Sequence, residues 1–561
     1  MAVTLRRYCL PGAVVGRMGK RRRNPWFNVL HKLMVIVALI VPILSLLTGA
    51  QTPTRQITVD ARKQTPISPY IYGINYPDSN FGDWLDDWDR HHDAFTLARE
   101  GGNRFTAYNW ETNASNAGND YFFENDDYLG KSNEPGWTVK EFLTHVQRTG
   151  AASLLTVPTL GYVSADKDNN RDGGKDVNNS KDYIHTRFHR SIARKPGGRF
   201  AYPPNLNDGV VYEDEFVHWV ESVKSANTPV WFSLDNEPDF WHNTHLRIKP
   251  TAPTYAEIIA NNIEYASAIK GVAPKSLVFG PVNYGWYGFR AFQGAPDANG
   301  RIFVDAYLAA MQSASEKAGK RLLDAYDFHW YPEAMGDGVR IVYNAAPDKP
   351  GTVTARIQAP RSLWDPTYVE QSWITNSNGK KPIRLLPDML ERVQKNYPGT
   401  KLSISEYDFG GRDKISGALA QADALGIFGR YGLFAACHWG LNYKEHAAMA
   451  GFQAFTNYDR AGSRFGNIGL EVYGESPSDN SVYASLDSNN PNRLTIVVIN
   501  KTTLAQPMKI SLKGFQPKSG RTFVVSDGVF DKPSNIEVRV TPASASMTAP
   551  PLSISTISLS R

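Results

Sequence analysis

Cysteine is nearly absent from this 561-residue sequence, which contains only Cys9 and Cys437. Cys9 lies in a leader segment that we expect to be removed, so no intramolecular disulfide can form in the remaining chain and disulfide-stapled folds are excluded. We find no internal repeat and no low-complexity tract. The sequence therefore predicts ordinary hydrophobic cores, with Cys437 as a buried apolar side chain.

A strong excess of charge is also lacking, with 61 Lys and Arg against 55 Asp and Glu. Eight of the basic residues, and none of the acidic ones, fall within the first 50 positions, which leaves a net charge of −2 for the rest of the chain. The overall charge of +6 therefore gives no support to a nucleic-acid partner, and we expect none.

A hydrophobic run long enough to span a membrane as a helix, about 20 residues, is missing as well. The apolar run from Leu33 to Leu47 is shorter; basic residues precede it and Thr48-Gly49-Ala50 follows. This order of basic, apolar and small residues is typical of a secretory signal peptide. We expect residues 1–50 to be cleaved and the mature protein to be secreted, with no membrane partner; an uncleaved, anchored N-terminus is the alternative.

Short β-prone runs alternate with helical stretches through most of the chain, as in a (β/α)8 barrel. The clearest helix, Tyr255 to Lys270, has an apolar face. The eight expected strands are Tyr70 to Asn75, Asn103 to Asn109, Ser153 to Thr159, Val230 to Asp235, Leu277 to Val282, Tyr326 to Trp330, Leu402 to Glu406 and Ala435 to Leu441.

The last hundred residues have a different pattern, with short strands separated by Gly, Pro, Asn and Ser and without helices, which is typical of a β-sandwich. The run Gln56 to Asp60 alternates apolar and polar residues like a half-buried strand. We therefore predict an α/β fold: a TIM-like (β/α)8 barrel at 66–455 with an attached all-β sandwich at 456–561, to which an N-terminal strand within 51–65 contributes.

The stretch Val230 to His245, VWFSLDNEPDFWHNTH, combines an apolar strand with an acidic tip that contains Glu237. Barrel enzymes carry their chemistry at the C-terminal ends of the strands. Trp241 follows closely, and flat apolar rings beside a carboxylic acid suit a sugar ring. A capped strand end without catalytic function is the alternative interpretation of this stretch alone.

A second carboxylate of the same kind is Glu406, in KLSISEYDFGG at the end of a later strand. Two carboxyl groups that flank a glycosidic bond can hydrolyse it: one protonates the leaving oxygen, and the other attacks the carbon or activates water. Taken alone, Glu406 is better explained as a helix-capping or salt-bridged acid. The pair at two strand ends favours a glycosidase.

Other expected strand ends carry polar and aromatic residues that suit the same site. We expect the substrate to be bound by side chains from four of these strand ends: Arg104, Asn109 and Trp110; Asn236 and Trp241; His329 and Tyr331; and Trp439. Each of them alone is also explained by a structural role, since most buried polar groups serve local hydrogen bonds. Their shared position at strand ends is what favours a binding site.

Four stretches, GGNRFTAYNWETNASNAGNDY, SLDNEPDFWHNTH, DFHWYPEA and SISEYDFGG, resemble glycoside hydrolase family 44. These secreted microbial endo-β-1,4-glucanases include xyloglucanases, and the likeness extends from about Tyr70 through the C-terminal sandwich. The resemblance implies a barrel with a sandwich built from both chain ends. It also implies retaining hydrolysis, with Glu237 as acid/base, Glu406 as nucleophile and Asn236 in contact with the sugar 2-hydroxyl.

Retention makes a geometric prediction, because the two carboxyl groups of a retaining enzyme lie about 5 to 5.5 Å apart. Glu237 has to be protonated when the substrate arrives, and we expect burial and the charge of Glu406 to raise the pKa of Glu237. Arg104 and Tyr331 are the expected partners that keep Glu406 ionised.

One loop resembles the first half of a calcium-binding loop, with oxygen-bearing side chains at alternate positions, Asp168, Asn170 and Asp172, followed by Gly173. The twelfth position is Asn179 where an EF-hand has Glu. Two interpretations stay open: a structural calcium ion, or an Asn-rich surface loop that binds no metal.

We therefore expect a monomeric hydrolase of β-1,4-glucan that requires no cofactor, apart from the structural calcium considered above. A hydrolase that acts mainly on mannan or xylan is an alternative within enzymes. A non-catalytic polysaccharide-binding protein with a degenerate barrel is the alternative from another class, although such a protein need not keep both carboxylates.

Overall fold

The computed structural model describes residues 53–75, 88–169, 176–343, 348–441 and 444–561. Thr54–Arg561 forms one compact unit, and the expected signal peptide lies outside the described residues. Among the residues that the structure describes, no helix is both long and apolar enough to cross a membrane.

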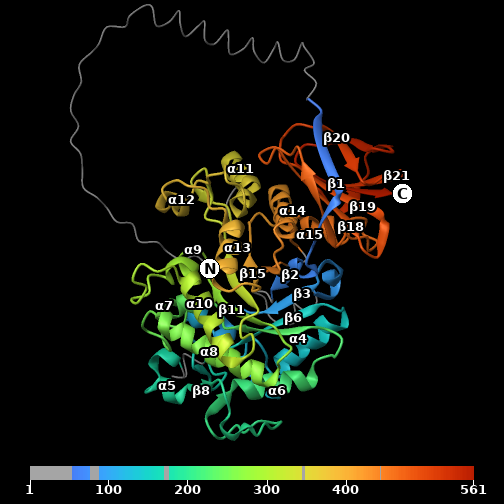
Figure 1. Ribbon diagram of the computed structural model, residues 1–561. Coiled ribbons are helices and arrows are strands. Elements are labelled where there is room, and N and C mark those ends of the chain that lie inside the picture. The colour runs from blue at the N-terminus through green and yellow to red at the C-terminus, as the bar shows by residue number, and fades with distance from the viewer. Residues whose placement is uncertain (1–52, 76–87, 170–175, 344–347, 442–443) are drawn as a thin grey trace, which may run out of the picture. The chain divides into compact units, whose positions relative to one another are not determined.

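Eight parallel strands close into a barrel, which confirms the predicted fold class (Figure 1). Seven of the eight strands overlap the ranges expected from the sequence. In order around the barrel they are β2 (Gly73–Asn75), β3 (Leu97–Glu100), β6 (Ala152–Val157), β10 (Val230–Leu234), β11 (Val278–Asn283), β12 (Ala325–Trp330), β15 (Lys401–Tyr407) and β16 (Ala435–His438).

The second strand is the exception, because the prediction of a strand at Asn103 to Asn109 is wrong. Those residues begin with the short helix α3 (Asn103–Thr106), and the strand is β3, which pairs with β2 and β6. β3 has the sequence LARE, and all four residues are buried. Its two charged residues, Arg99 and Glu100, hid the strand from a search for apolar runs.

Helices surround the barrel strands, as in other α/β barrels. Helix α8 illustrates how its sequence sets its start: the Thr254 side chain accepts from the Glu257 backbone, and the Glu257 carboxylate accepts from the Thr254 N–H. The longer helices are α4 (Trp137–Arg148), α6 (Glu213–Val223), α8 (Tyr255–Val272), α10 (Phe303–Ala318), α11 (Pro350–Gln358), α13 (Leu385–Asn396), α14 (Ile415–Arg430) and α15 (His446–Thr456).

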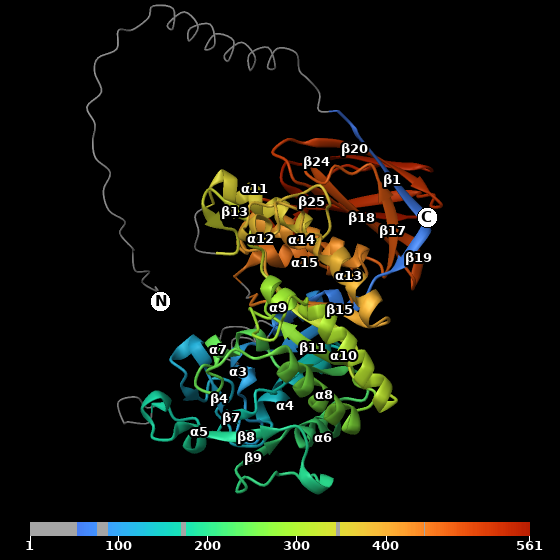
Figure 2. The ribbon, with the colours of Figure 1, turned by 60° about the vertical axis from the view of Figure 1, so that its left-hand side comes forward.

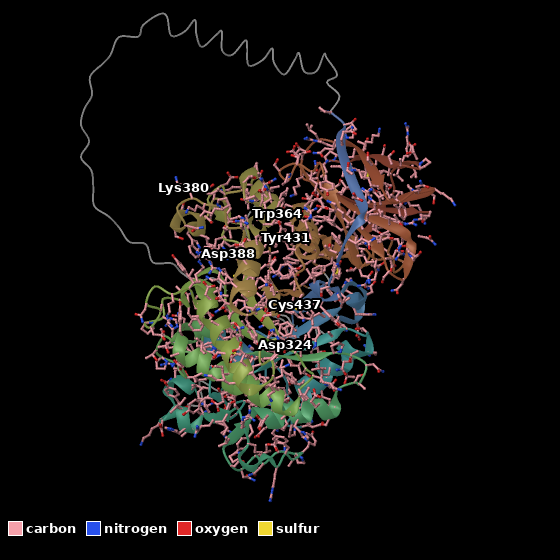
Figure 3. All side chains as sticks on the ribbon, viewed as in Figure 1. Asp324, Trp364, Lys380, Asp388, Tyr431 and Cys437 are labelled. Atoms are coloured by element: carbon pink, nitrogen blue, oxygen red, sulfur yellow. The ribbon has the colours of Figure 1, made fainter. Side chains whose placement is uncertain are left out.

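Apolar side chains fill the lower part of the barrel, at the N-terminal ends of the strands. Trp231, Phe279 and Cys437 belong to this cluster, and Trp231 packs on Tyr70 and Phe434. Cys437, labelled in Figure 3, is fully buried, and burial raises the pKa of its thiol. The barrel is therefore closed below, and chemistry is confined to the opposite end.

Ten strands form one continuous sheet beside the barrel (Figure 2). Strands β19 and β24 lie several places apart in this sheet yet contact each other, so the sheet folds over a common apolar core as a sandwich. Its order is β22 (Val529–Ser534), β21 (Ser519–Ser526), β25 (Ser553–Ser560), β19 (Asn490–Asn500), β18 (Asn480–Asp487), β17 (Ile468–Tyr473), β1 (Arg55–Pro66), β20 (Gln506–Lys513), β24 (Ser544–Ala549) and β23 (Arg539–Thr541).

The N-terminal strand β1 lies inside this sheet, antiparallel to β17 and parallel to β20. Both ends of the described chain therefore build the sandwich. Helix α14 packs between the sandwich and the barrel and is buried along nearly its whole length. Its Asp423 accepts hydrogen bonds from Lys501 and from the Tyr483 hydroxyl, both of which belong to the sandwich part of the chain.

Candidate active site

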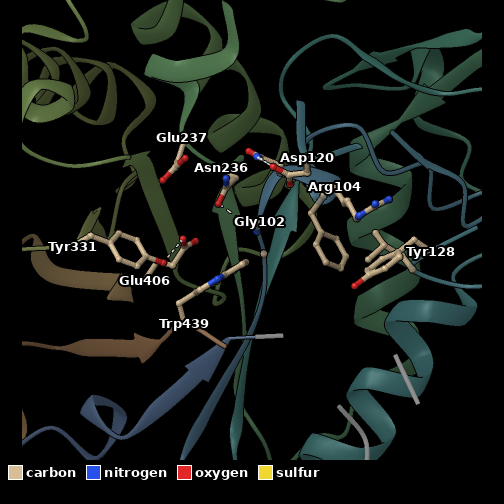
Figure 4. A pocket seen from close by; sticks show the side chains of 13 residues that line it. Gly102, Arg104, Asp120, Tyr128, Asn236, Glu237, Tyr331, Glu406 and Trp439 are labelled. Atoms are coloured by element: carbon tan, nitrogen blue, oxygen red, sulfur yellow. Dashed lines mark hydrogen bonds between the residues drawn. The ribbon is translucent and has the colours of Figure 1, made fainter. Parts of the chain in front are cut away.

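A cavity of about 460 Å³ opens at the C-terminal ends of the barrel strands (Figure 4). Its lining combines acidic, amide and aromatic side chains, as expected for a site that binds a polar ring. The lining residues are Gly101, Gly102, Asn103, Arg104, Phe105, Asp120, Tyr128, Leu129, Asn236, Glu237, Tyr331, Glu406 and Trp439. Five strand ends or the loops that follow them supply these residues.

Glu237 stands just beyond β10, where the backbone adopts a left-handed conformation with φ of 44°. Pro238 starts a short helical turn directly after it, so the strand ends abruptly and the side chain enters the cavity. Its Oε1 lies 2.8 Å from Nδ1 of His329. Burial raises the pKa of Glu237 to about 7, against the opposing charge of Arg99. Burial, rather than the charge of Glu406, is therefore the main cause of the raised pKa.

Glu406 lies near the end of β15, where the pairing with β12 shifts register between Phe328 and His329. The Tyr331 hydroxyl donates to its Oε1 at 2.8 Å, and Arg99 Nη1 donates to its Oε2 at 2.9 Å. Burial raises the pKa of Glu406, whereas Arg99 and Tyr331 act in the opposite direction. Because Glu406 contacts a cation and a hydroxyl donor, it ionises before Glu237.

The two glutamates and His329 lie close together, with one ligand atom from each within 4.8 Å of the others. Burial lowers the pKa of His329 to about 4, so its imidazole is neutral. With its proton on Nε2, which lies 3.5 Å from Glu406, His329 accepts a hydrogen bond from protonated Glu237 through Nδ1. Such a trio can in principle hold a metal ion, but the guanidinium already bound to Glu406 repels a second cation.

Arg99 is the functional residue that the sequence analysis missed. Its side chain is fully buried, and besides Glu406 it donates to Asn75 Oδ1 and to Asn236 Oδ1. Gly101 has to be glycine, because a Cβ there would overlap the Arg99 guanidinium. A buried Arg-Glu pair followed by Gly-Gly was the available signal, and it was overlooked because the strand was expected six residues later.

Asn236 is held in a fixed orientation. Its Oδ1 accepts from Arg99 Nη2 at 2.7 Å and from the Gly102 backbone at 3.3 Å, and its own backbone N–H donates to Asp235. The Nδ2 donor group therefore points the other way, beside Glu237 in the cavity (Figure 4).

Trp439 and Tyr331 lie in the cavity wall, as do Asn236 and both glutamates, while His329 lies behind the wall against both glutamates. The Trp439 ring packs against Gly102, where any Cβ would meet it. These predicted residues are brought together by the fold. The aromatic ring and the carboxylates face one space, as a sugar-binding pocket requires.

Arg104 also lines the cavity, but it does not contact Glu406 as expected. It forms an ion pair with Asp126 and lies 4.0 Å from the centre of the Tyr128 ring. Figure 4 shows its side chain directed away from the two glutamates, toward Tyr128. The cation next to Glu406 is Arg99, which corrects that part of the prediction.

Three predicted substrate-binding residues do not reach the cavity, namely Asn109, Trp110 and Trp241. Asn109 donates to the Ser164 carbonyl and is fully buried. Trp110 stacks on Trp219 at 5.7 Å between ring centres, and the Trp241 indole donates to Asp235. The first two followed the misplaced strand, and Trp241 turns inward on the short helix α7 (Trp241–Thr244). Their roles are structural.

The loop considered for calcium is only partly described, because Asn170 and Asp172 lie outside the described residues. Asp168 is described, and its carbonyl accepts a hydrogen bond from Arg187, which also forms an ion pair with Asp166. The calcium site therefore stays a prediction.

Comparisons with known proteins point the same way as this geometry. The model of glycoside hydrolase family 44 matches residues 114–334. Endoglucanase A of Paenibacillus lautus is 38% identical over 499 residues, covering 86% of this chain and 68% of that protein. The β-mannanase/endoglucanase A of Caldicellulosiruptor saccharolyticus is 38% identical over 475 residues, covering 80% of this chain but only 34% of that protein.

Solved structures give the same result. The structure of a family 44 xyloglucanase from Paenibacillus polymyxa with xyloglucan is similar to this chain with a TM-score of 0.81 and 35% identity. The match covers 91% of this chain and 100% of that chain. The likeness therefore includes both the barrel and the sandwich.

Proposed function

This chain belongs to glycoside hydrolase family 44, and we propose that it is an endo-acting β-1,4-glucan hydrolase that retains configuration through a double displacement. The observation that carries this proposal is the pairing of Glu237 and Glu406 across one cavity. A carboxylate oxygen of one lies within 4.8 Å of a carboxylate oxygen of the other. Retaining enzymes need a short separation, whereas inverting ones leave about 6.5 to 9.5 Å for a water molecule.

In the first step, Glu406 acts as nucleophile and Glu237 as acid. The ionised Glu406 attacks the anomeric carbon, and Glu237 protonates the departing glycosidic oxygen, which leaves as an alcohol. Arg99 and Tyr331 bind Glu406 and oppose the rise in its pKa that burial causes, which favours the ionised carboxylate. The raised pKa of Glu237, about 7, keeps its proton in place until that moment.

In the second step, the roles of Glu237 change. Now ionised, it accepts a proton from a water molecule that attacks the anomeric carbon, and the bond to Glu406 breaks. The product therefore keeps the original configuration, and both carboxyl groups return to their starting states. Asn236 Nδ2, held beside Glu237 by Arg99, is placed to contact the sugar 2-hydroxyl.

The proposed substrate is an unbranched or xylose-branched β-1,4-glucan, because relatives are named endoglucanase and xyloglucanase. Mannan is the second candidate, since one relative is named β-mannanase/endoglucanase A, although this chain covers 34% of that longer protein. Release of reducing ends from carboxymethylcellulose, xyloglucan and mannan, measured side by side, distinguishes these substrates. Binding without release would instead favour a non-catalytic polysaccharide-binding protein.

The two carboxylate roles are tested by chemical rescue. With an activated aryl glycoside as substrate, Glu406→Ala should lose turnover and regain it with azide, yielding a glycosyl azide of inverted configuration. Glu237→Ala should yield the azide of retained configuration, because Glu406 still forms the covalent intermediate. The opposite stereochemistry in either variant would overturn the assignment.

We also propose that the protein is secreted after cleavage of residues 1–50, that it works as a monomer, and that the 168–172 loop is a candidate for structural calcium. The basic, apolar and small-residue order of the first 50 positions supports the first of these. The mass of the exported protein tests the cleavage. A melting temperature that EDTA does not change would argue against calcium.

A further inference from the structure

We propose that Tyr121 and Phe122 form a second sugar-binding surface, an aromatic rim that holds the glucan chain where it leaves the catalytic cavity. The inference rests on the proposed function, because the bound molecule is the same polysaccharide. It adds a binding site outside the cavity that only a polymer or long oligosaccharide can reach.

The rim continues directly from the cavity wall. Asp120 lines the cavity, Asn103 from the same wall donates to it at 3.0 Å, and Tyr121 and Phe122 are the next two residues in the chain. Consecutive Cα atoms are 3.8 Å apart, so the Cα atoms of Tyr121 and Phe122 both lie within about 8 Å of the Asp120 Cα. A polymer that passes the two glutamates and extends beyond Asp120 therefore comes within reach of these two residues.

Both rings are accessible, although most aromatic side chains of the barrel are buried. Tyr121 is 47% exposed and Phe122 is 54% exposed. Their ring centres lie 5.1 Å apart and the ring planes are nearly perpendicular, at 79°. One aromatic edge supports the other, so the pair presents a fixed apolar surface of the kind that stacks on a sugar ring.

The backbone of this turn is unusual for aromatic residues. Phe122 and Phe123 both have left-handed backbones, with φ of 54° and 60°. Side chains with a Cβ rarely adopt this conformation, and Gly or Asn usually occupies such positions. Strained positions of this sort cluster at ligand sites, where the surrounding structure holds them.

The turn is held firmly by its surroundings. Phe123 N donates to the Gly118 carbonyl at 2.7 Å, and Asn116 and Asn178 donate to the carbonyls of Phe123 and Phe122. Gly118 also packs against Thr244, on the short helix that follows Glu237, so closely that a Cβ would overlap it. The rim is therefore positioned relative to the acid/base before substrate arrives, which reduces the ordering cost of binding.

The test compares a polymer with a short substrate, using Tyr121→Ala/Phe122→Gly in the full chain. Glycine accepts the left-handed backbone, so this variant removes the rings without adding strain. We expect the ratio of kcat/KM on soluble xyloglucan or carboxymethylcellulose to kcat/KM on an aryl cellobioside to fall about tenfold, or about 1.4 kcal/mol. Tyr473→Ala is the matched control, since Tyr473 is 41% exposed but lies on sandwich strand β17.

A second measurement keeps the inference testable if the double variant is unstable. In the Glu406→Gln background, calorimetry with cellohexaose should show weaker binding for Phe122→Gly than for Phe122 intact. The proposal is wrong if removal of the rings leaves two quantities unchanged: the ratio of the two kcat/KM values, relative to Tyr473→Ala, and the affinity for cellohexaose. If the unaltered protein hydrolyses no glucan, the proposed function fails instead, so the two failures can be told apart.

Discussion

At the scale of single residues, the site gives two carboxyl groups different surroundings: the Glu406 side chain is 8% exposed and the Glu237 side chain is 20% exposed. Glu406 contacts Arg99 and the Tyr331 hydroxyl, whereas Glu237 faces a neutral imidazole. Differences of this kind divide acid and nucleophile roles between paired carboxyls. The proposed roles of Glu237 as acid and Glu406 as nucleophile therefore depend on the positive charge of Arg99.

Removal of that charge should be costly. Arg99→Gln is expected to lower kcat/KM by about 100-fold, the scale of losing one preorganised donor. The acidic limb of the pH profile should also move to higher pH, because Glu406 loses the cation that lowers its pKa. Arg356→Gln is the control, since Arg356 lies on α11 and is equally buried but pairs with Asp348. An unmoved acidic limb in Arg99→Gln would contradict the assigned role.

The raised pKa of Glu237 predicts the alkaline limit of activity. Because the acid has to be protonated, kcat/KM should fall as pH rises through about 7. Stability should change in the same direction: a carboxyl whose folded pKa lies above its unfolded value stabilises the fold at low pH and loses this contribution as pH rises through 7. Melting curves of Glu237→Gln from pH 4 to 8 should lack that part of the decline; identical pH dependence in both proteins would refute it.

At the scale of elements, the sequence predicted the strands and helices that have a regular apolar pattern, and it missed the one barrel strand that lacks such a pattern. Seven barrel strands and α8 followed their apolar periodicity, and Glu237 and Glu406 were found because each closes an apolar strand. Strand β3 was missed because two of its four residues are charged and buried. Asn109 and Trp110 were then wrongly assigned to the cavity. The sequence pattern placed them at the end of a barrel strand, but the real strand, β3, ends at Glu100.

The loop after β16, which carries Trp439, is held in place by an arginine from another loop. Arg412, which lies between β15 and α14, donates to the carbonyls of Trp439 and Gly440 and pairs with Asp408. Burial opposes ionisation of Asp408, but Arg412 and His438 lower its pKa to about 2. A guanidinium thus fixes the backbone that carries the cavity tryptophan, which a lysine with its single ammonium group does not reproduce.

We therefore expect Arg412→Lys to raise KM for glucan oligosaccharides about fivefold, equivalent to about 1 kcal/mol, while kcat changes less. The reason is that we expect the ring of Trp439, which lines the cavity, to bind substrate without taking part in bond breaking. Arg361→Lys is a close control, because Arg361 also pairs with an acid four residues away in the chain, Asp365, and its side chain is 14% exposed, against 13% for Arg412. Equal KM values in the two variants would show that the contact does not position Trp439.

At the scale of the whole molecule, the chain joins its sandwich to its barrel through buried contacts. β1 inserts between β17 and β20, and α14 packs against sandwich strands β18, β19 and β25. Segments far apart in sequence make these contacts, so the sequence pattern indicated two kinds of domain without indicating how they adhere. The adhesion includes one buried ion pair, Lys501 with Asp423 at 2.7 Å, and each side chain is 1% exposed.

Replacing only one partner of this ion pair should lower the free energy of unfolding by far more than the intact pair contributes to it. Lys501→Met leaves the Asp423 carboxylate buried without its cation, which costs about 3 to 5 kcal/mol. The melting temperature should fall by several degrees, and the double variant Lys501→Met/Asp423→Leu should recover most of the loss, because no buried charge remains. Neither residue lies in the catalytic cavity, so kcat/KM at 25 °C should stay unchanged.

Arg539→Met is the control for a surface ion pair, because the Arg539 and Glu537 side chains are 80% and 73% exposed. A Lys501→Met melting temperature equal to that baseline would mean that the ion pair does not brace the barrel against the sandwich.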